Sequence, residues 1–251
     1  MNTDKEMLSN QLRQLCLTVF ANQYESTAIT CEKNNHSHVE FLKQLADLET
    51  EHRHNKRIDR LLKQAKLPRE KTLLSFDCKR VPGLSYTQIE RLATGEFLDR
   101  CENILIFGNP GTGKTHLSIA LAQEWCLQGR KVFYSTAASL MQNLLKAKAE
   151  LKLNEFIKKM DRFEILLIDD ISYIPCDREE TDALFTLLSA RYEMRSILIT
   201  SNLVFDKWDS IFKDKMTTAA AIDRLVHHST ILELNAESYR ISAAKQKKEV
   251  I

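Results

Sequence analysis

The stretch "GNPGTGKTHLS", residues 108–118, is the part of the sequence that decides the fold. Gly108 is followed by four residues and then by Gly113, Lys114 and Thr115. This is the spacing G-x-x-x-x-G-K-[ST] of a phosphate-binding loop, in which glycines let the backbone turn its N–H groups toward phosphate oxygens. The stretch therefore predicts a site for a nucleoside triphosphate.

Apolar residues on both sides of this loop predict a strand before it and a helix after it. Residues 104–107 form a continuous apolar run, which suits a strand buried on both faces. From Leu117 to Leu127 apolar residues recur at nearly helical spacing, and Gly129 is a helix stop signal. A chance glycine-rich turn would need neither neighbour, so the context favours a phosphate loop at a helix N-terminus.

The loop residues have separate expected roles. The Lys114 ammonium would reach the β and γ phosphates of ATP, and the Thr115 hydroxyl would bind Mg²⁺. The residues expected to bind the nucleotide are Gly108, Asn109, Pro110, Gly111, Thr112, Gly113, Lys114, Thr115 and His116.

Composition indicates a soluble protein with a core of ordinary size. Hydrophobic residues make up 43% of the 251 residues, and the formal net charge is only +2. No apolar run approaches the ~20 residues that span a bilayer, and the N-terminus has no apolar signal-peptide core. Six scattered cysteines without a C-x-x-C pair indicate reduced thiols. We therefore expect a cytoplasmic protein without membrane association.

Two regions with different sequence patterns predict two domains. Residues 4–66 have helical apolar stripes, which predicts an N-terminal helical domain over residues 1–70. After residue 101, strands alternate with helical stretches, which predicts an α/β domain with a parallel sheet over residues 71–251. The expected strands are at about 103–107, 131–135, 164–168, 197–200 and 230–234.

The remaining polar residues of a hydrolytic site are expected at the ends of two strands. Asp169 and Asp170 follow the apolar run 165–168, and Asn202 follows the strand at 197–200. Ligands bind at the C-terminal ends of strands in open α/β sheets. We expect Asp169 to hold Mg²⁺, Asp170 to activate the attacking water, and Asn202 to contact the γ-phosphate or that water. The alternative for Asp169 and Asp170 is an acidic turn after a strand without a catalytic role. The alternative for Asn202 is a polar residue that only ends its strand.

Arg224 is a candidate arginine finger on a short helix predicted over 219–226. Its guanidinium geometry suits the charge on γ-phosphate oxygens in the transition state. The alternative role for Arg224 is an ion pair on the surface of its helix. His227 and His228 are adjacent without further ligand spacing, so we expect a structural or interfacial role for them and no metal site.

These motifs together resemble the IstB-like helper ATPases of insertion-sequence transposons and, more distantly, the DnaC-type helicase loaders, both in the AAA+ superfamily. The segments that carry the resemblance are "RIDRLLKQAKLPREKTLLSFD", "GNPGTGKTHLSIALA", "ILLIDDISYIP", "LITSN", "AIDRLVHHS" and "ESYR". The resemblance implies an ATPase that binds duplex DNA largely without sequence preference, forms a homo-oligomer, and helps a transposase select or receive target DNA. It also implies that Arg224 acts on ATP held by a neighbouring subunit.

Two features depart from the AAA+ pattern. Most AAA+ enzymes carry glutamate after the metal-binding aspartate, whereas this chain has Asp170, so we expect slow turnover. Only 17 residues follow Leu234, so no C-terminal lid domain is expected. Within "ESYR", Arg240 is a candidate substitute phosphate sensor, and an ordinary tail helix is the alternative.

Two basic stretches are candidates for DNA contact. Residues 52–71 carry eight Lys or Arg against two acids, and residues 141–160 carry five lysines against two glutamates. The first stretch could dock a transposase instead, and a solvated helix face is the alternative for the second. The lysines expected to meet phosphates are Lys146, Lys148, Lys152, Lys158 and Lys159.

Two other functions are compatible with the sequence. One is a replicative helicase loader, in which the N-terminal domain would bind a helicase. The other is a nucleotide-gated binding module without meaningful turnover. The neighbouring gene, co-purification with a helicase, and a turnover assay with and without duplex DNA would separate the three.

Overall fold

The computed structural model describes residues 2–173, 178–208 and 215–239. The chain divides into two compact units, Met1–Arg60 and Leu61–Ile251. The division lies before the boundary near residue 70 that the sequence suggested. The reason is that Leu61, Ala65 and Leu67 are already buried in the core of the second unit.

The N-terminal unit is helical, as the apolar stripes indicated. Its helices are α1 (Asn2–Gln14), α2 (Thr18–Lys33) and α3 (His38–Ala65), and the division between the units falls within α3. Its small core contains Val19, Ala21, Cys31 and Leu45.

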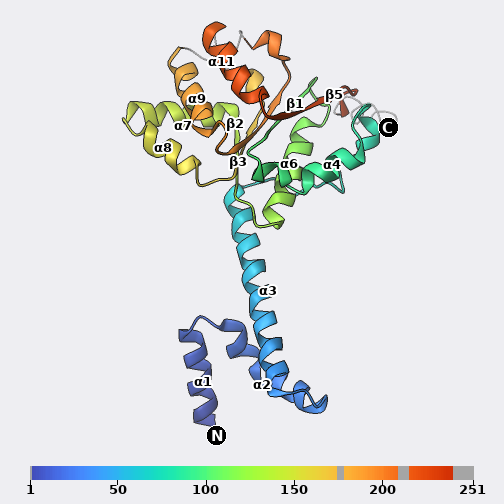
Figure 1. Cartoon of the computed structure of the whole chain (residues 1–251), viewed down its shortest axis with the longest axis vertical. Coiled ribbons are helices and arrows are strands. Elements are labelled where there is room, and N and C mark those ends of the chain that lie inside the picture. Colours follow the sequence, from blue (N-terminus) through green and yellow to red (C-terminus); the bar gives the residue numbers. More distant parts are fainter. Residues whose placement is uncertain (1, 174–177, 209–214, 240–251) are drawn as a thin grey trace, which may run out of the picture. The chain divides into compact units, whose positions relative to one another are not determined.

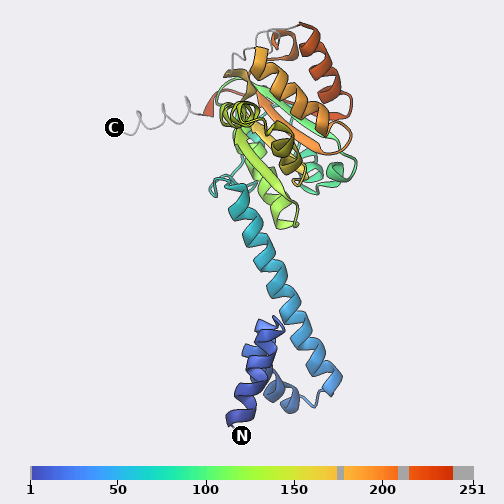
Figure 2. The same ribbon diagram turned by 90° about the vertical axis from the view of Figure 1, so that its left-hand side faces the viewer.

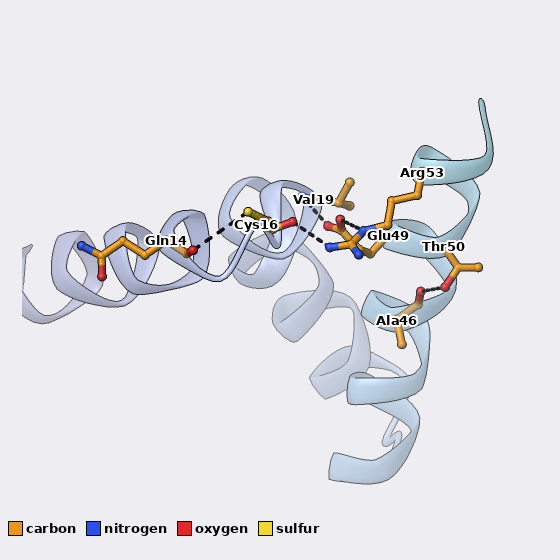
Figure 3. A network of polar contacts seen from close by, with 7 residues as sticks. All are labelled: Gln14, Cys16, Val19, Ala46, Glu49, Thr50 and Arg53. Atoms are coloured by element: carbon orange, nitrogen blue, oxygen red, sulfur yellow. Dashed lines mark hydrogen bonds and ion pairs between the residues drawn. The ribbon is translucent and has the colours of Figure 1, made fainter. Parts of the chain in front are cut away.

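A buried carboxylate joins the helices of this unit (Figure 3). Glu49 on α3 is 5% exposed and accepts hydrogen bonds from the Val19 backbone N–H at 2.9 Å and from Arg53 Nε at 2.8 Å. Arg53 also donates to the Cys16 carbonyl at 2.8 Å. Leu17 gives α2 no side-chain cap, so Glu49 supplies the acceptor that the start of this helix requires. Burial tends to raise the pKa of Glu49, but the hydrogen bonds from Arg53 and Val19 outweigh it, and the pKa is lowered.

The second unit contains one parallel sheet of five strands. In space their order is β2-β3-β4-β1-β5, and every pair of neighbours is parallel. The strands are β1 (Asn103–Gly108), β2 (Val132–Thr136), β3 (Ile165–Asp169), β4 (Ser196–Ser201) and β5 (Ser229–Leu234). Each agrees with its predicted range to within one residue at either end.

Helices cover both faces of this sheet, as Figures 1 and 2 show. The α-helices are α4 (Tyr86–Ala93), α5 (Glu96–Asp99), α6 (Lys114–Leu127), α7 (Ala137–Ala149), α8 (Leu153–Met160), α9 (Arg178–Arg191) and α11 (Lys215–Val226). Short 3₁₀ turns are η1 (Cys78–Arg80), η2 (Ile171–Tyr173) and η3 (Phe205–Lys207). Within residues 2–173, 178–208 and 215–239, no helix is long and apolar enough to cross a membrane.

The strands contribute side chains to two hydrophobic cores, one on each face of the sheet, because successive side chains of a strand point to opposite faces. In β1, Leu105 and Phe107 pack with α7, α8, α9 and α11, while Ile104 and Ile106 pack with α4, α5 and α6. The buried residues of the central strands β1, β3 and β4 are mostly apolar on both faces, which is why these strands appear in the sequence as apolar runs. The α/β fold class predicted from the sequence is therefore confirmed.

The strand order places the polar strand ends next to each other. β4 lies between β1 and β3, so the phosphate loop after β1, Asp169 at the end of β3 and Thr200 in β4 reach the same edge of the sheet. Five cysteines in the described ranges are free, and Cys176 lies outside them.

Replacing Glu49 tests its role in the N-terminal unit. We expect Glu49→Gln to remove the ionic acceptor and to lower local stability by about 1 to 3 kcal/mol at pH 7. Hydrogen exchange of the Val19 amide in the full chain measures this loss. Because the folded-state pKa of Glu49 is lowered, its contribution is complete above the unfolded-state pKa and disappears as pH falls through the folded value.

The difference between wild type and Glu49→Gln should therefore shrink in acid. Glu51→Gln removes the same charge from an exposed position of α3 and serves as the control. Equal protection of the Val19 amide in all three proteins would contradict a capping role for Glu49.

Candidate active site

The phosphate loop turns directly into α6 through glycine geometry. Gly113 has φ +100°, in the left-handed region that other residues rarely adopt, and precedes Lys114, the first residue of α6. A Cβ on Gly108 would lie 2.6 Å from the Leu234 carbonyl of β5, so the loop can pass there only as glycine. No side chain caps α6 at Gly113, and the N-terminal N–H groups of the helix therefore suit an anion.

The Lys114 ammonium lies beside the loop and is almost buried, since the residue is 6% exposed. Its Nζ donates to the carbonyls of Gly108 at 2.7 Å and Asn109 at 2.9 Å, and also to Asn202 Oδ1. The loop carbonyls hold the ammonium group at the N-terminus of α6, where the sequence predicted contact with the β and γ phosphates.

The two predicted magnesium ligands lie within hydrogen-bond distance of each other. Thr115 Oγ1 donates to Asp169 Oδ1 at 2.9 Å, and Thr200 Oγ1 donates to the same oxygen at 2.7 Å. Hydroxyl and carboxylate oxygens are hard ligands of the kind that Mg²⁺ prefers, and Mg²⁺ usually takes few protein ligands beside phosphate and water. Thr115 and Asp169 therefore fit the role of holding this ion with ATP.

The backbone turns sharply at Asp170, directly after β3. Its φ is +60°, a left-handed conformation that aspartate tolerates better than most residues. The Asp170 N–H donates to Thr200 Oγ1 at 2.8 Å, and its carboxylate accepts from Asn202 Nδ2 at 3.2 Å. Burial raises the pKa of Asp170, the charge of Asp169 adds to this rise, and Lys114 opposes it. A carboxylate with a raised pKa is better matched to accepting a proton near neutral pH.

Asn202 connects the lysine of the loop with the second aspartate. Its Oδ1 accepts from Lys114, and its Nδ2 donates to Asp170. Its backbone N–H donates to Ser172 Oγ at 2.6 Å, and Ser172 is also bonded to Ser201. These contacts fix the amide between the two charged groups.

A cavity of about 730 Å³ opens beside this network. Residues 110–116, Asp170, Thr200 and Asn202 line one part of it. The other part is lined by residues that the sequence analysis did not assign to the site: Glu70, Lys71, Ser75, Phe76, Asp77, Arg80, Val81, Ala236, Glu237 and Tyr239. The apolar Phe76 and Val81 among them suit the base of a nucleotide.

Contacts from two distant segments hold the phosphate loop at this cavity. His116 Nε2 lies 3.0 Å from the Thr72 carbonyl and 3.1 Å from Ser75 Oγ. The Tyr239 N–H donates to the Gly111 carbonyl at 2.9 Å, and the Arg80 guanidinium lies 4.9 Å from the Tyr239 ring centre. The segment "LPREKTLLSFD" supported the family resemblance, but it contains no spacing that identifies cavity-lining residues. Arg240 lies outside the described residues.

Arg224 does not line the cavity. It is half-buried on α11, donates to Ser189 Oγ on α9, and stacks 4.7 Å from the ring centre of Phe185. The structure therefore brings together the phosphate loop, Asp169, Asp170 and Asn202, but it leaves Arg224 on a pair of outer helices of the same chain.

The predicted DNA-binding lysines lie on α7, on α8 and in the turn between them. Leu140, Leu144, Ile157 and Met160 bury the opposite sides of these helices in the core. The lysines that are exposed to solvent are Lys146, Lys152, Lys158 and Lys159, and Lys148 is half-buried with its Nζ bonded to the Glu179 carbonyl.

The two histidines after α11 have a third polar neighbour. Glu193, His227 and His228 are exposed and bring one potential ligand atom each to within 4.8 Å of the others. His227 Nδ1 is hydrogen-bonded to the Tyr192 hydroxyl at 2.8 Å, which joins the end of α11 to the turn after α9. The interpretation of these histidines as structural or interfacial remains a prediction.

Solved structures of the same architecture include two replication proteins. DnaA from Aquifex aeolicus bound to AMPPCP is 24% identical, with a TM-score of 0.57 over 74% of this chain and 56% of that chain. The DnaC helicase loader is 16% identical, with a TM-score of 0.52 over 59% of this chain and 87% of that chain. At these identities the likeness shows the AAA+ phosphate-loop fold alone.

Sequence relatives are more specific. The family described as IstB-like ATP binding protein matches residues 10–248. An insertion sequence ATP-binding protein of Sinorhizobium fredii is 40% identical over 246 residues, which cover 98% of this chain and 83% of that relative. Together with a phosphate loop joined to two strand-end carboxylates, these matches show that the chain belongs to the IstB-like ATP-binding protein family.

Proposed function

We propose that this protein is an ATPase that binds duplex DNA and assists the transposase of an insertion sequence in selecting or receiving its target. The observation that carries the proposal is the polar network of the site. It joins Thr115 to Asp169, Asp169 to Thr200, and Asn202 to both Asp170 and Lys114. A protein that only bound nucleotide would need the loop and the metal ligand, but not a second carboxylate positioned beside them.

Each residue of the network has a distinct role in the proposed hydrolysis. Lys114 neutralises the charge of the β and γ phosphates, and Thr115 and Asp169 hold Mg²⁺. The ion, when bound, supplies Lewis-acid stabilisation of the phosphoryl oxygens. Asp170 accepts a proton from the attacking water, and the Asn202 amide orients that water or the γ-phosphate.

The geometry of Asp170 bears on the rate. Aspartate is one methylene shorter than the glutamate that usually follows the metal-binding residue. Its carboxylate therefore lies farther from the attacking water and holds that water less closely. Asn202 donates to the Asp170 carboxylate, which fixes the position of that carboxylate but also uses one of its acceptor sites. We therefore infer slow intrinsic turnover, stimulated by DNA or a partner that moves Asn202.

Oligomerisation completes the proposed site. The contacts of Arg224 with Ser189 and Phe185 keep it away from the cavity of its own chain. In an assembly, Arg224 on α11 would leave these two partners to reach the ATP of a neighbouring copy. We propose that Arg224 stabilises the transition state in that copy, so that hydrolysis depends on assembly.

The proposed DNA surface is the lysine-bearing side of α7 and α8. Its exposed ammonium groups would neutralise phosphates, which supplies affinity without sequence preference. The basic stretch 52–71 is a second candidate for DNA or for the transposase.

Helicase loading is the second candidate function, because the DnaC helicase loader is among the structures with a similar fold. Co-purification separates the two functions. Retention of a transposase encoded next to this protein supports the proposal, whereas retention of a hexameric replicative helicase supports loading. If no phosphate is released either with or without duplex DNA, the result supports the third function, a nucleotide-gated binding module.

The first prediction separates nucleotide binding from hydrolysis. Asp170→Asn should bind ATP normally and release phosphate at least about 10²-fold more slowly, because an amide cannot accept the proton of the water. Lys114→Ala should fail to bind ATP. Nucleotide titration and phosphate release with duplex DNA measure both, and Asp182→Asn on the outer helix α9 is the control. Turnover of Asp170→Asn at the wild-type rate would remove Asp170 from the mechanism.

The second prediction concerns the lysine surface. Changing Lys146, Lys148 and Lys152 together to glutamine should weaken binding about equally on unrelated duplexes and lower the slope of log affinity against log salt by up to about 3. ATP binding without DNA should not change. Glutamine at Lys33, Lys43 and Lys131 removes the same charge elsewhere. An unchanged salt slope in the first variant would mean that these lysines form only a solvated face.

The third prediction concerns Arg224 acting between subunits. Arg224→Ala should bind ATP normally but hydrolyse it about 10³ to 10⁵-fold more slowly if chemistry limits turnover. Mixing it with Lys114→Ala should restore part of the activity, because an intact Arg224 on one copy can then meet ATP held by an intact Lys114 on the next. The exposed Arg195→Ala serves as the control.

Co-assembly of the two variants must be shown in the same sample. If the mixture remains inactive although mixed assemblies form, Arg224 does not act in trans. Wild-type turnover by Arg224→Ala alone would exclude any role in hydrolysis.

A further inference from the structure

The turn between α7 and α8 carries an exposed leucine in an unfavourable conformation. Leu151 is 94% exposed and has φ +57°. The turn itself is tightly bonded, since the Leu151 N–H donates to the Lys148 carbonyl at 3.0 Å and the Lys152 N–H donates to the Ala147 carbonyl at 2.7 Å. The side chain is therefore held outward on a fixed backbone and not on a loose loop.

Leucine is a poor choice at this position on two independent grounds. The left-handed region is unfavourable for a residue with a branched apolar side chain, and helices that end this way usually place glycine or asparagine there. Exposure also forgoes the stabilisation that burial of a leucine provides. The left-handed conformation ends α7 by satisfying the Lys148 and Ala147 carbonyls, but the exposed leucine side chain adds nothing to the core, which Leu144 and Met160 complete beneath it. An almost fully exposed apolar side chain on a fixed turn is available to a partner outside the folded chain.

The surroundings of Leu151 identify the chemistry of a partner. Lys146, Lys152, Lys158 and Lys159 are exposed on the adjoining helices and turn, and Lys152 Nζ pairs with the exposed Glu150 at 3.4 Å. Between residues 137 and 160, Leu151 is the one large hydrophobic side chain that is exposed. A protein interface would need a wider apolar patch, whereas one apolar tip among several cations suits a polyanion with an apolar interior.

We propose that Leu151 enters a groove of duplex DNA as a wedge at a base step, while the neighbouring lysines bind the phosphates. The proposal rests on the DNA contact of α7 and α8 proposed above. Proteins that deform DNA insert apolar side chains such as leucine between base pairs and partly unstack them. The left-handed turn serves this purpose by presenting the side chain at the end of a rigid helix pair.

The wedge gives the protein a sequence preference that lysine contacts cannot supply. Unstacking is easiest at pyrimidine–purine steps such as TA and CA, so these steps should be favoured at the contact points. Leu151 then selects the step, and the lysines supply affinity regardless of sequence.

Leu151→Asn tests the wedge without damaging the turn. Asparagine tolerates the left-handed conformation, so the melting temperature and DNA-free ATP turnover should be unchanged or slightly raised. Wild-type protein with a non-hydrolysable ATP analogue should raise the fluorescence of 2-aminopurine placed beside a TA step in a duplex. We expect Leu151→Asn to lose this gain and the preference for TA over AA steps, while keeping the wild-type salt dependence of binding. Leu151→Met, which keeps an apolar side chain, should retain the gain.

The outcomes separate the wedge from the proposed function. If the variant of Lys146, Lys148 and Lys152 weakens DNA binding but Leu151→Asn keeps the fluorescence gain, DNA binding stands and the wedge is wrong. If that lysine variant binds DNA like wild type, the DNA surface and the wedge both fail. If Leu151→Asn instead loses only retention of the transposase, the tip is a protein-docking element and the proposal is overturned.

Discussion

Oxygen Oδ1 of Asp169 accepts hydrogen bonds from two hydroxyls that come from different parts of the chain. Thr115 is the last residue of the phosphate loop and lies in the first turn of α6, and Thr200 belongs to β4. Asp169 is only 7% exposed, so its charge is held in place by these donors and not by bulk water. The remainder of the site depends on this contact, because Thr200 also fixes the backbone of Asp170, and Asp170 in turn bonds Asn202.

The sheet makes this contact possible. With β4 between β1 and β3, three strand ends meet at one edge, and apolar side chains above and below leave the strands no freedom to slide. A shift of one residue in β3 would move Asp169 to the other face of the sheet, away from Thr115. The two hydrophobic cores therefore determine the position of this carboxylate.

Charged groups are distributed according to the partner that each would meet. Two carboxylates and one ammonium lie together in a partly buried site that suits a metal–nucleotide complex. Burial and then the charge of Asp169 raise the pKa of Asp170, whereas Lys114 opposes this rise. The exposed lysines of α7 and α8 lie on a solvated side of the same unit, where they cost little in stability. In the N-terminal unit the buried Glu49 has a structural role, because its partners are a helix start and a neighbouring arginine.

The sequence by itself determined the α/β fold, the five strands and the residues of the phosphate loop. Apolar runs mark strands buried on both faces, and the glycine spacing is set by local backbone geometry, so neither depends on distant residues. Asp169, Asp170 and Asn202 could be proposed because residues at the ends of parallel strands share one edge of the sheet. Only the tertiary structure decided that Phe76, Arg80 and Tyr239 line the cavity, since they reach it from segments far apart in sequence that carry no periodic pattern. It also decided that Arg224 packs on α9 and that Leu151 is exposed in a left-handed turn, because side-chain burial and the sign of φ depend on the packing of whole helices and not on residue type.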